Sequence, residues 1–173
     1  MSRSRAPCLA ISKPLDLPIR KALVAIDRSA TARGALLVAL SWVSAVRAGA
    51  ADGENPTLTA LFVDPGTNES GATDTVGEKT IEHELNVLRR NAAAWAGVTV
   101  VSETIEGRDP APLIASYAQD HGSELVVIGT RAPEHRDAAL GSVSASVTTR
   151  LCIPVLLVPP AVWRDHAKDI DYF

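Results

Sequence analysis

The residues with the clearest chemical potential in this sequence lie between Gly129 and Ser142. Gly129 ends the apolar run "LVVIG", and Gly141-Ser142 opens "GSVSASVTTRL", which has the apolar spacing of a short helix. The first amides of a helix have no acceptor within the helix and lie at the positive end of its dipole. Such amides commonly bind phosphate groups. The spacing therefore indicates a phosphate-binding turn, in which the Ser142 hydroxyl is either a further donor or only the helix cap.

The loop between these glycines departs from a typical phosphate cradle. Ala132-Pro133 stands where a glycine would leave a free amide, and Pro133 lacks an N–H and favours extended geometry at Ala132. The ionisable residues of the loop are Arg131, Glu134, His135, Arg136 and Asp137. Their formal charges nearly cancel. We therefore expect the loop to weaken phosphate binding through its backbone and not through its charge.

A second polar candidate, Asp27, ends the apolar run "KALVAID". Its carboxylate could accept hydrogen bonds from a ligand, or could simply cap the following helix or lie in a loop. His135, Asp137 and Ser142 contain the atoms of a nucleophilic triad, but they crowd one loop with no separate element to orient them. The cysteines and histidines lack the paired spacing of a zinc site, and no Walker loop or dinucleotide fingerprint is present. These patterns predict no catalytic residue and no metal site.

The elements that must position these residues alternate along the chain. Short apolar runs predict strands at 21–27, 56–64, 98–106, 124–129 and 153–158. Helical spacing predicts helices at 31–50, at 81–95, at 109–122 after the start signal Asp109-Pro110, and at 141–151. Strands of this kind between helices indicate a parallel sheet covered on both faces. Ligands bind beyond the carboxyl ends of such strands, so Asp27 and Gly129 meet if the strand order is 3-2-1-4-5.

Composition limits the class of protein. The chain has 173 residues, 46% of them hydrophobic, and a formal net charge of -3, which argues against nucleic-acid binding through a broad basic surface. No apolar run approaches the roughly 18–20 residues of a membrane span, and the first residues do not form a signal peptide. We therefore expect one folded domain at 21–158, with tails at 1–20 and 159–173. Two distant cysteines suit a reducing, cytoplasmic setting.

Three segments together resemble the universal stress protein family. They are "LVAIDRS", "EGRDPAPLIASYAQDHGSELVVIGT" and "GSVSASVTTRLCIPVLLV", and the similarity runs from about Lys21 to Val158. The resemblance implies a Rossmann-like α/β fold with a five-stranded parallel sheet in the order 3-2-1-4-5. It also implies a homodimer through the fifth strand, Ile153 to Val158. Pro154 would permit this pairing if its nitrogen faces away from the partner.

The resemblance further implies an adenine nucleotide, ATP or AMP, with Mg²⁺ accompanying it. The implied binding residues are Ala25, Asp27, Val63, Ile128, Gly129, Arg131, Gly141, Ser142 and Val143. In the family's binding pattern a second glycine would stand at Ala132, and nine residues would separate it from the next glycine. Here eight residues separate Ala132 from Gly141.

We therefore expect a regulatory nucleotide-binding domain that acts in a stress response with an unknown signalling partner. It would bind neither nucleic acid nor membrane. A nucleotide-free homodimer that works through protein contacts is the alternative, and an enzyme, at most a slow ATPase, ranks third.

Overall fold

The computed structural model describes residues 8–10, 17–27, 30–48, 55–66, 97–130 and 141–159. The strands are β1 (Cys8–Ala10), β2 (Lys21–Ile26), β3 (Thr57–Asp64), β4 (Thr99–Glu106), β5 (Leu125–Gly129) and β6 (Val155–Val158). The helices are α1 (Ala30–Ala48), α3 (Pro110–Asp120) and α4 (Ser142–Arg150). The predicted helix at 81–95 and the C-terminal tail after Pro159 lie outside the described residues.

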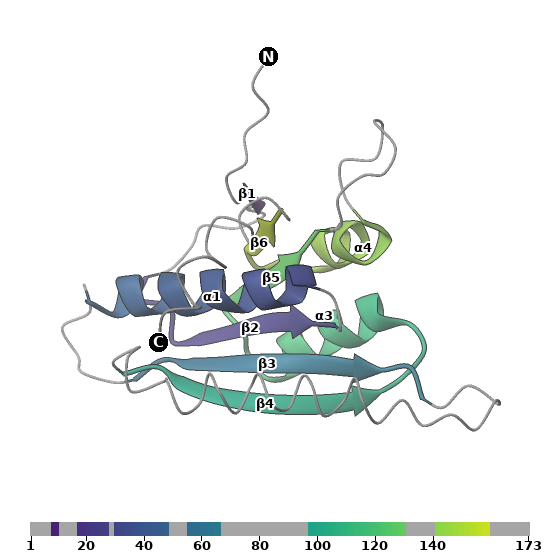
Figure 1. The fold of residues 1–173 in the computed structure, drawn as a ribbon, viewed down its shortest axis with the longest axis horizontal. Coiled ribbons are helices and arrows are strands. Elements are labelled where there is room, and N and C mark those ends of the chain that lie inside the picture. Colours follow the sequence, from purple (N-terminus) through teal and green to yellow (C-terminus); the bar gives the residue numbers. More distant parts are fainter. Residues whose placement is uncertain are drawn as a thin grey trace, which may run out of the picture.

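The described strands form one six-stranded sheet in the order β1-β6-β5-β2-β3-β4 (Figure 1). The strands β2 to β6 are parallel and are the five strands expected from the sequence, so the predicted order 3-2-1-4-5 is confirmed. β2 lies at the centre, where Ala25 is paired with Leu61 of β3 on one side and with Ile128 of β5 on the other. The winding of the chain reverses between β2 and β5, which is where such sheets bind ligands.

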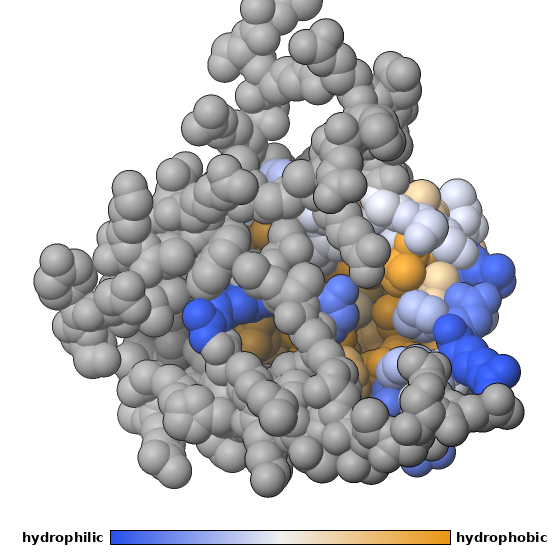
Figure 2. Space-filling view, turned by 45° about the vertical axis from the view of Figure 1, so that its right-hand side comes forward, coloured by the Kyte–Doolittle hydropathy of each residue, from blue (hydrophilic) through white to orange (hydrophobic). Residues whose placement is uncertain are grey.

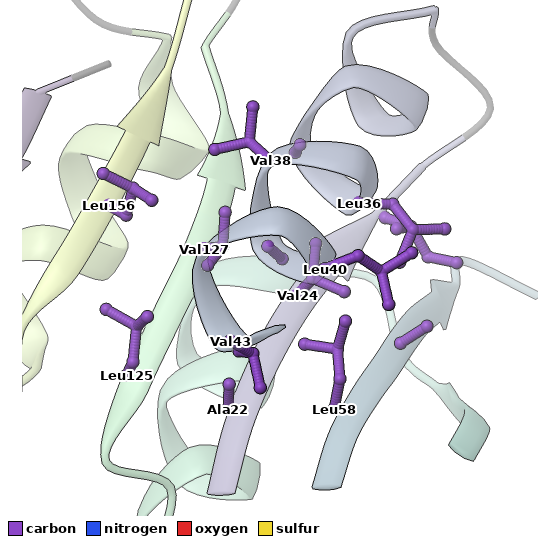
Figure 3. Packing of buried hydrophobic residues seen from close by; sticks show 14 of the residues in the cluster. Ala22, Val24, Leu36, Val38, Leu40, Val43, Leu58, Leu125, Val127 and Leu156 are labelled. Atoms are coloured by element: carbon purple, nitrogen blue, oxygen red, sulfur yellow. The ribbon is translucent and has the colours of Figure 1, made fainter. Parts of the chain in front are cut away.

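One face of the sheet is covered by α1 (Figure 3). The helix predicted at 31–50 is confirmed, and its residues Leu36, Leu40 and Val43 are buried against the sheet. Their partners in the sheet include Val24 of β2 and Val127 of β5. Both strands are buried on this face and on the opposite one, which explains why their sequences are continuous apolar runs and not alternating ones.

The opposite face is covered by α3 and α4, which pack on Leu23, Val126 and their neighbours. The predicted start of α3 is confirmed: Asp109 is the N-cap, Pro110 is the first helical residue, and the Asp109 carboxylate accepts from the Ala111 N–H at 3.4 Å. Among the described residues, no helix is both long enough and apolar enough to cross a bilayer.

The amino ends of the strands are joined by hydrogen bonds. The Glu124 carboxylate accepts from the backbone N–H groups of Arg20 and Lys21, and the Glu124 N–H donates to the Lys21 carbonyl at 2.8 Å. On the other side, the Thr57 N–H donates to the Arg20 carbonyl at 2.8 Å. The starts of β2, β3 and β5 are therefore held together at the end of the sheet opposite the strand carboxyl ends.

The segment expected to be an N-terminal tail contributes a strand to this sheet. Residues Cys8–Ala10 form β1, which pairs antiparallel with β6 and adds a sixth strand to the five that were expected. Figure 1 shows β1 beside β6 at one end of the sheet, with β3 and β4 at the other. A three-residue strand is too short to show a hydrophobic period, so the sequence pattern could not predict it.

Candidate functional site

A cavity of about 670 Å³ lies beyond the carboxyl ends of β2, β3 and β5. Its volume is within the usual range for small-molecule sites, about 300–1,000 Å³. The strand ends contribute Ala25, Ile26, Asp27, Phe62, Val63, Ile128 and Gly129. The helices and loops contribute Ala32, Pro65, Gly107, Arg108, Pro110, Ile114, Gly141, Ser142, Val143 and Ser144.

The cavity brings together the site residues predicted from the sequence, with one omission. Asp27 and Gly129 both line it, so the two strand ends expected to meet do so. The β2–β5 register accounts for this, because Ala25 lies opposite Ile128 and the next residues continue to the same edge. Arg131, together with the rest of the loop up to Leu140, lies outside the described residues.

The start of α4 supplies backbone donors to the cavity. The N-cap is Gly141, with φ -67° and ψ 157° and no side-chain cap, and the first helical bond runs from the Ala145 N–H to the Gly141 carbonyl at 2.9 Å. The amides of Ser142, Val143 and Ser144 precede that bond and therefore have no acceptor within the helix. These three residues line the cavity. The helix start can thus bind an anionic group at its positive end.

Ser142 does not cap this helix. It is the first helical residue and its side chain is exposed, whereas the cap position belongs to Gly141. Reading Ser142 as a cap was therefore wrong, which leaves its hydroxyl as a donor or acceptor at the cavity. The hydroxyl of Ser144 is used differently, since this buried side chain donates to the Gly141 carbonyl at 3.0 Å.

The sequence reasoning missed the contribution of the loop between β4 and α3. Gly107 and Arg108 follow β4 directly, and both line the cavity. The Gly107 N–H donates to the Asp64 carbonyl at 2.8 Å, which continues the β3–β4 pairing to this point. Arg108 lies between that bond and the capping residue Asp109, so its backbone is fixed on both sides. The missed signal was positional, because "EGRDP" follows a parallel strand and must therefore lie at the same edge as Asp27.

The described part of the cavity lining carries one positively and one negatively charged side chain. Asp27 and Arg108 are the charged residues of the described lining, and both are exposed. Within the described residues, the Arg108 guanidinium has no hydrogen bond or ion pair. Between them the walls are apolar and include Phe62, Val63 and Ile128. Such a site suits a ligand with a flat apolar part and separate polar groups.

Figure 2 turns the carboxyl ends of the strands forward and shows hydrophobic surface recessed between hydrophilic residues. Within the described residues, no group of three metal-ligating side chains is found. Among the described residues that line the cavity, the donors are backbone amides, the hydroxyls of Ser142 and Ser144 and the Arg108 guanidinium, and the charged side-chain acceptor is the Asp27 carboxylate.

Comparisons with known proteins agree with this arrangement. The sequence model described as "Universal stress protein family" matches residues 18–159. A comparison with curated proteins gives no match. Among solved structures, universal stress protein UspA from Lactobacillus plantarum is 22% identical, with a TM-score of 0.59, covering 83% of this chain and 99% of its own.

Two further structures show the same fold. A universal stress protein from Burkholderia pseudomallei is 24% identical with a TM-score of 0.56, covering 82% of this chain and 96% of its own. One from Archaeoglobus fulgidus, solved in complex with dAMP, is 17% identical with a TM-score of 0.55, covering 80% of this chain and 96% of its own. Because the family match spans most of the chain and the sheet has the same fold as these structures, the chain belongs to the universal stress protein family.

Proposed function

We propose that the cavity binds an adenine nucleotide and that binding acts as a regulatory signal in a stress response. The observation that carries this proposal is that one cavity joins the Asp27 carboxylate to the amides at the start of α4. A nucleotide needs both features, an acceptor for its ribose hydroxyl or base amino groups and donors for its phosphate. The structural relative solved with dAMP supports this ligand class.

The nucleoside would lie along the strand ends. Asp27 would accept from the ribose or the adenine, with Ala25 close to the base. The backbone at Val63 would present hydrogen-bonding groups to the adenine edge, and Ile128-Gly129 would form the floor. These residues lie at the ends of neighbouring paired strands, so their positions are fixed by the sheet. A rigid frame of this kind lowers the entropy lost on binding.

Arg108 would contact the base end of the ligand. Gly129 and Arg108 lie at opposite ends of a row formed by β5, β2, β3 and β4. Three strand spacings separate these outer strands, about 14 Å in total. With phosphates at the Gly141-Ser142 end, the guanidinium would stack on the base or donate to it.

The phosphates would be held by the amides of Ser142 and Val143, the Ser142 hydroxyl, and Arg131 from the neighbouring loop. Ala132-Pro133 removes one amide donor from that loop. A lost charge-assisted hydrogen bond costs on the order of 1.5–3 kcal/mol, which is roughly ten- to a hundredfold in affinity. We therefore place ATP and AMP close together in affinity, with Mg²⁺ entering only as part of the nucleotide.

A second candidate function is a nucleotide-free homodimer that acts through protein contacts with a signalling partner. In this candidate the interface would be β6, the last parallel strand of the sheet, once its outer edge is released by β1. We also keep the cytoplasmic location as part of the proposal, since the exposed free thiol of Cys152 suits a reducing compartment.

Calorimetric titration of the purified chain with adenosine, AMP, ATP with Mg²⁺, and GTP tests the proposal. We expect saturable binding of the adenine ligands, no comparable heat with GTP, and a rise in melting temperature that grows with ligand concentration. Absence of binding by all the adenine ligands would favour the nucleotide-free dimer. A steady release of phosphate from ATP, abolished in Asp27→Asn, would instead favour the slow ATPase.

A further inference from the structure

The outer edge of β6 is covered by the chain itself. β1 pairs antiparallel with β6, with Cys8 opposite Leu157, Leu9 opposite Leu156 and Ala10 opposite Val155. Without β1, β6 would be the last strand on this side of the described sheet. An uncovered strand edge pairs readily with another chain, and proteins often cover such edges with a further element.

The hydrogen bonds of β6 show which residues face outward. The Pro154 carbonyl accepts from the Val126 N–H at 3.0 Å, and the Val158 carbonyl accepts from the Thr130 N–H at 2.9 Å. Residues 154 and 158 therefore face β5, and by alternation so does residue 156. The missing N–H of Pro154 lies on this inner side, so Pro154 itself would not hinder pairing at the outer edge.

The same alternation turns the backbone groups of Val155 and Leu157 outward. These are the residues that lie opposite Ala10 and Cys8 in the β1–β6 register. In an antiparallel pair, alternate opposed residues exchange both of their hydrogen bonds. The next outward position is Pro159, which has no N–H to offer. Three residues of β1 are thus enough to occupy the outward donors and acceptors of the four-residue strand β6.

The resemblance to the universal stress protein family implies that β6 of a second copy can occupy this edge, and we propose that β1 is a displaceable cap that competes with that copy. Antiparallel pairing of β6 with its own copy is two-fold symmetric, so one short strand supplies both sides of the interface. The two pairings exclude each other, since each outward group of Val155 and Leu157 can serve one neighbouring strand. Release of β1 would therefore control dimer formation.

Two features make β1 suited to release. It contributes only three paired residues, and it precedes the segment that matches the family, 18–159. Because both copies must release β1, the apparent dissociation constant of the dimer rises with the square of the ratio of seated to released cap. A cap that is seated about ten times as often as it is released would raise that constant about a hundredfold.

Sedimentation equilibrium of the full chain and of two truncated chains tests the proposal. Deletion of residues 2–16 removes β1, whereas deletion of residues 2–7 keeps it and is the matched control. We expect the full chain and the control to be monomers at concentrations where the longer deletion forms a dimer, with a dissociation constant lowered at least about tenfold, or 1.4 kcal/mol. An unchanged monomer after the longer deletion would overturn the proposal.

A reversible disulfide lock between β1 and β6 tests, in the full-length chain, whether β1 and a second copy compete for the edge of β6. Opposed residues of an antiparallel pair lie within disulfide reach, so Leu157→Cys can bond to the native Cys8 in a chain that also carries Cys152→Ser. We expect an intramolecular disulfide, and a monomer at every concentration until reductant is added. Ala10→Cys with Val155→Cys, in a chain carrying Cys8→Ser and Cys152→Ser, provides the same lock if the first variant does not fold.

Two outcomes of the lock would contradict the proposal. A disulfide-linked dimer would show that β1 pairs with the second copy and does not cap its own chain. An intramolecular lock that leaves a dimer with an unchanged dissociation constant would show that copies associate elsewhere. None of these readouts depends on nucleotide, so the nucleotide proposal and the cap proposal can fail separately.

Discussion

Asp27 and Arg108 line the same cavity although their strands, β2 and β4, are separated in the sheet by β3. Two strand spacings place the strands about 10 Å apart. A ligand between them meets a carboxylate acceptor on one side and a guanidinium donor on the other, with apolar walls between. These opposite charges on two sides of the cavity would orient a polar ligand, which a purely apolar pocket could not do.

Asp27→Asn should weaken binding of adenosine, AMP and ATP by a similar factor. The amide keeps the shape of the carboxylate but loses a charge-assisted acceptor, which is expected to cost about 1.5–3 kcal/mol. Calorimetry with the three ligands measures this cost. Asp120→Asn is the control, because this exposed carboxylate accepts from the Ser116 hydroxyl on α3 and does not line the cavity. Unchanged affinity in Asp27→Asn would place the ligand elsewhere.

Arg108→Ala should lower the affinity for adenosine as much as that for ATP. A guanidinium that stacks on a base contributes about 0.5–2 kcal/mol, or roughly threefold to thirtyfold in the dissociation constant. Arg150→Ala is the control, since Arg150 donates to the Ser146 hydroxyl at the far end of α4 and lies outside the cavity lining. A loss confined to phosphorylated ligands would instead assign Arg108 to the phosphates.

Ser142→Ala should weaken the binding of phosphorylated ligands and leave the stability of the fold nearly unchanged. Because Gly141 holds the cap position, we expect the free energy of unfolding to change by less than about 0.5 kcal/mol. Affinity for AMP and ATP should fall while that for adenosine is kept. Ser144→Ala should give a different pattern, losing about 1 kcal/mol of stability with its bond to the Gly141 carbonyl. Chemical denaturation and calorimetry on both variants check this difference.

Replacing Ala132 and Pro133 by glycines should strengthen ATP binding by up to about a hundredfold if it restores one charge-assisted hydrogen bond. Adenosine affinity should stay constant, because in this proposal the nucleoside would lie at the strand ends and not against the loop. A titration of both ligands against the variant and the natural chain gives the answer. Equal ATP affinity in the two chains would mean that this loop does not contact phosphate.

Tyr117 should make stability depend on pH in the alkaline range. Burial raises the pKa of its phenol above the usual value of 10.0, and the charge of Glu103 adds to the effect. The unfolded chain therefore loses this proton first as the pH rises. The contribution of Tyr117 is complete below about pH 10 and is lost as the pH rises through its folded pKa. Denaturation in this range should show stability falling with pH, and the fall should be smaller in Glu103→Gln.

The parallel sheet could be anticipated because strands buried on both faces leave continuous apolar runs, as in "LVAI" and "LVVI". The strand order came only from the resemblance to the universal stress protein family. The start of α3 was equally readable, since Asp109-Pro110 combines a capping carboxylate with a proline in the first turn. These signals lie within short segments of the sequence, so they can be recognised without knowledge of the tertiary structure.

Other features depend on tertiary contacts. Gly141 and Ser142 are both acceptable at a helix cap, and only the backbone geometry decides between them. Arg108 is an ordinary exposed residue until the β3–β4 pairing brings it to the cavity. Residues Cys8–Ala10 form a strand because they pair with β6, and their own sequence is too short to predict it.

The hydrogen bonds around Glu124 fix where a shortened version of this protein should begin. Its carboxylate accepts from the amides of Arg20 and Lys21, and the Arg20 carbonyl accepts from the Thr57 N–H. A crystallisation fragment that starts at Leu17 keeps this closure intact, whereas one that starts at Ala22 would leave a carboxylate without partners beneath the central strand.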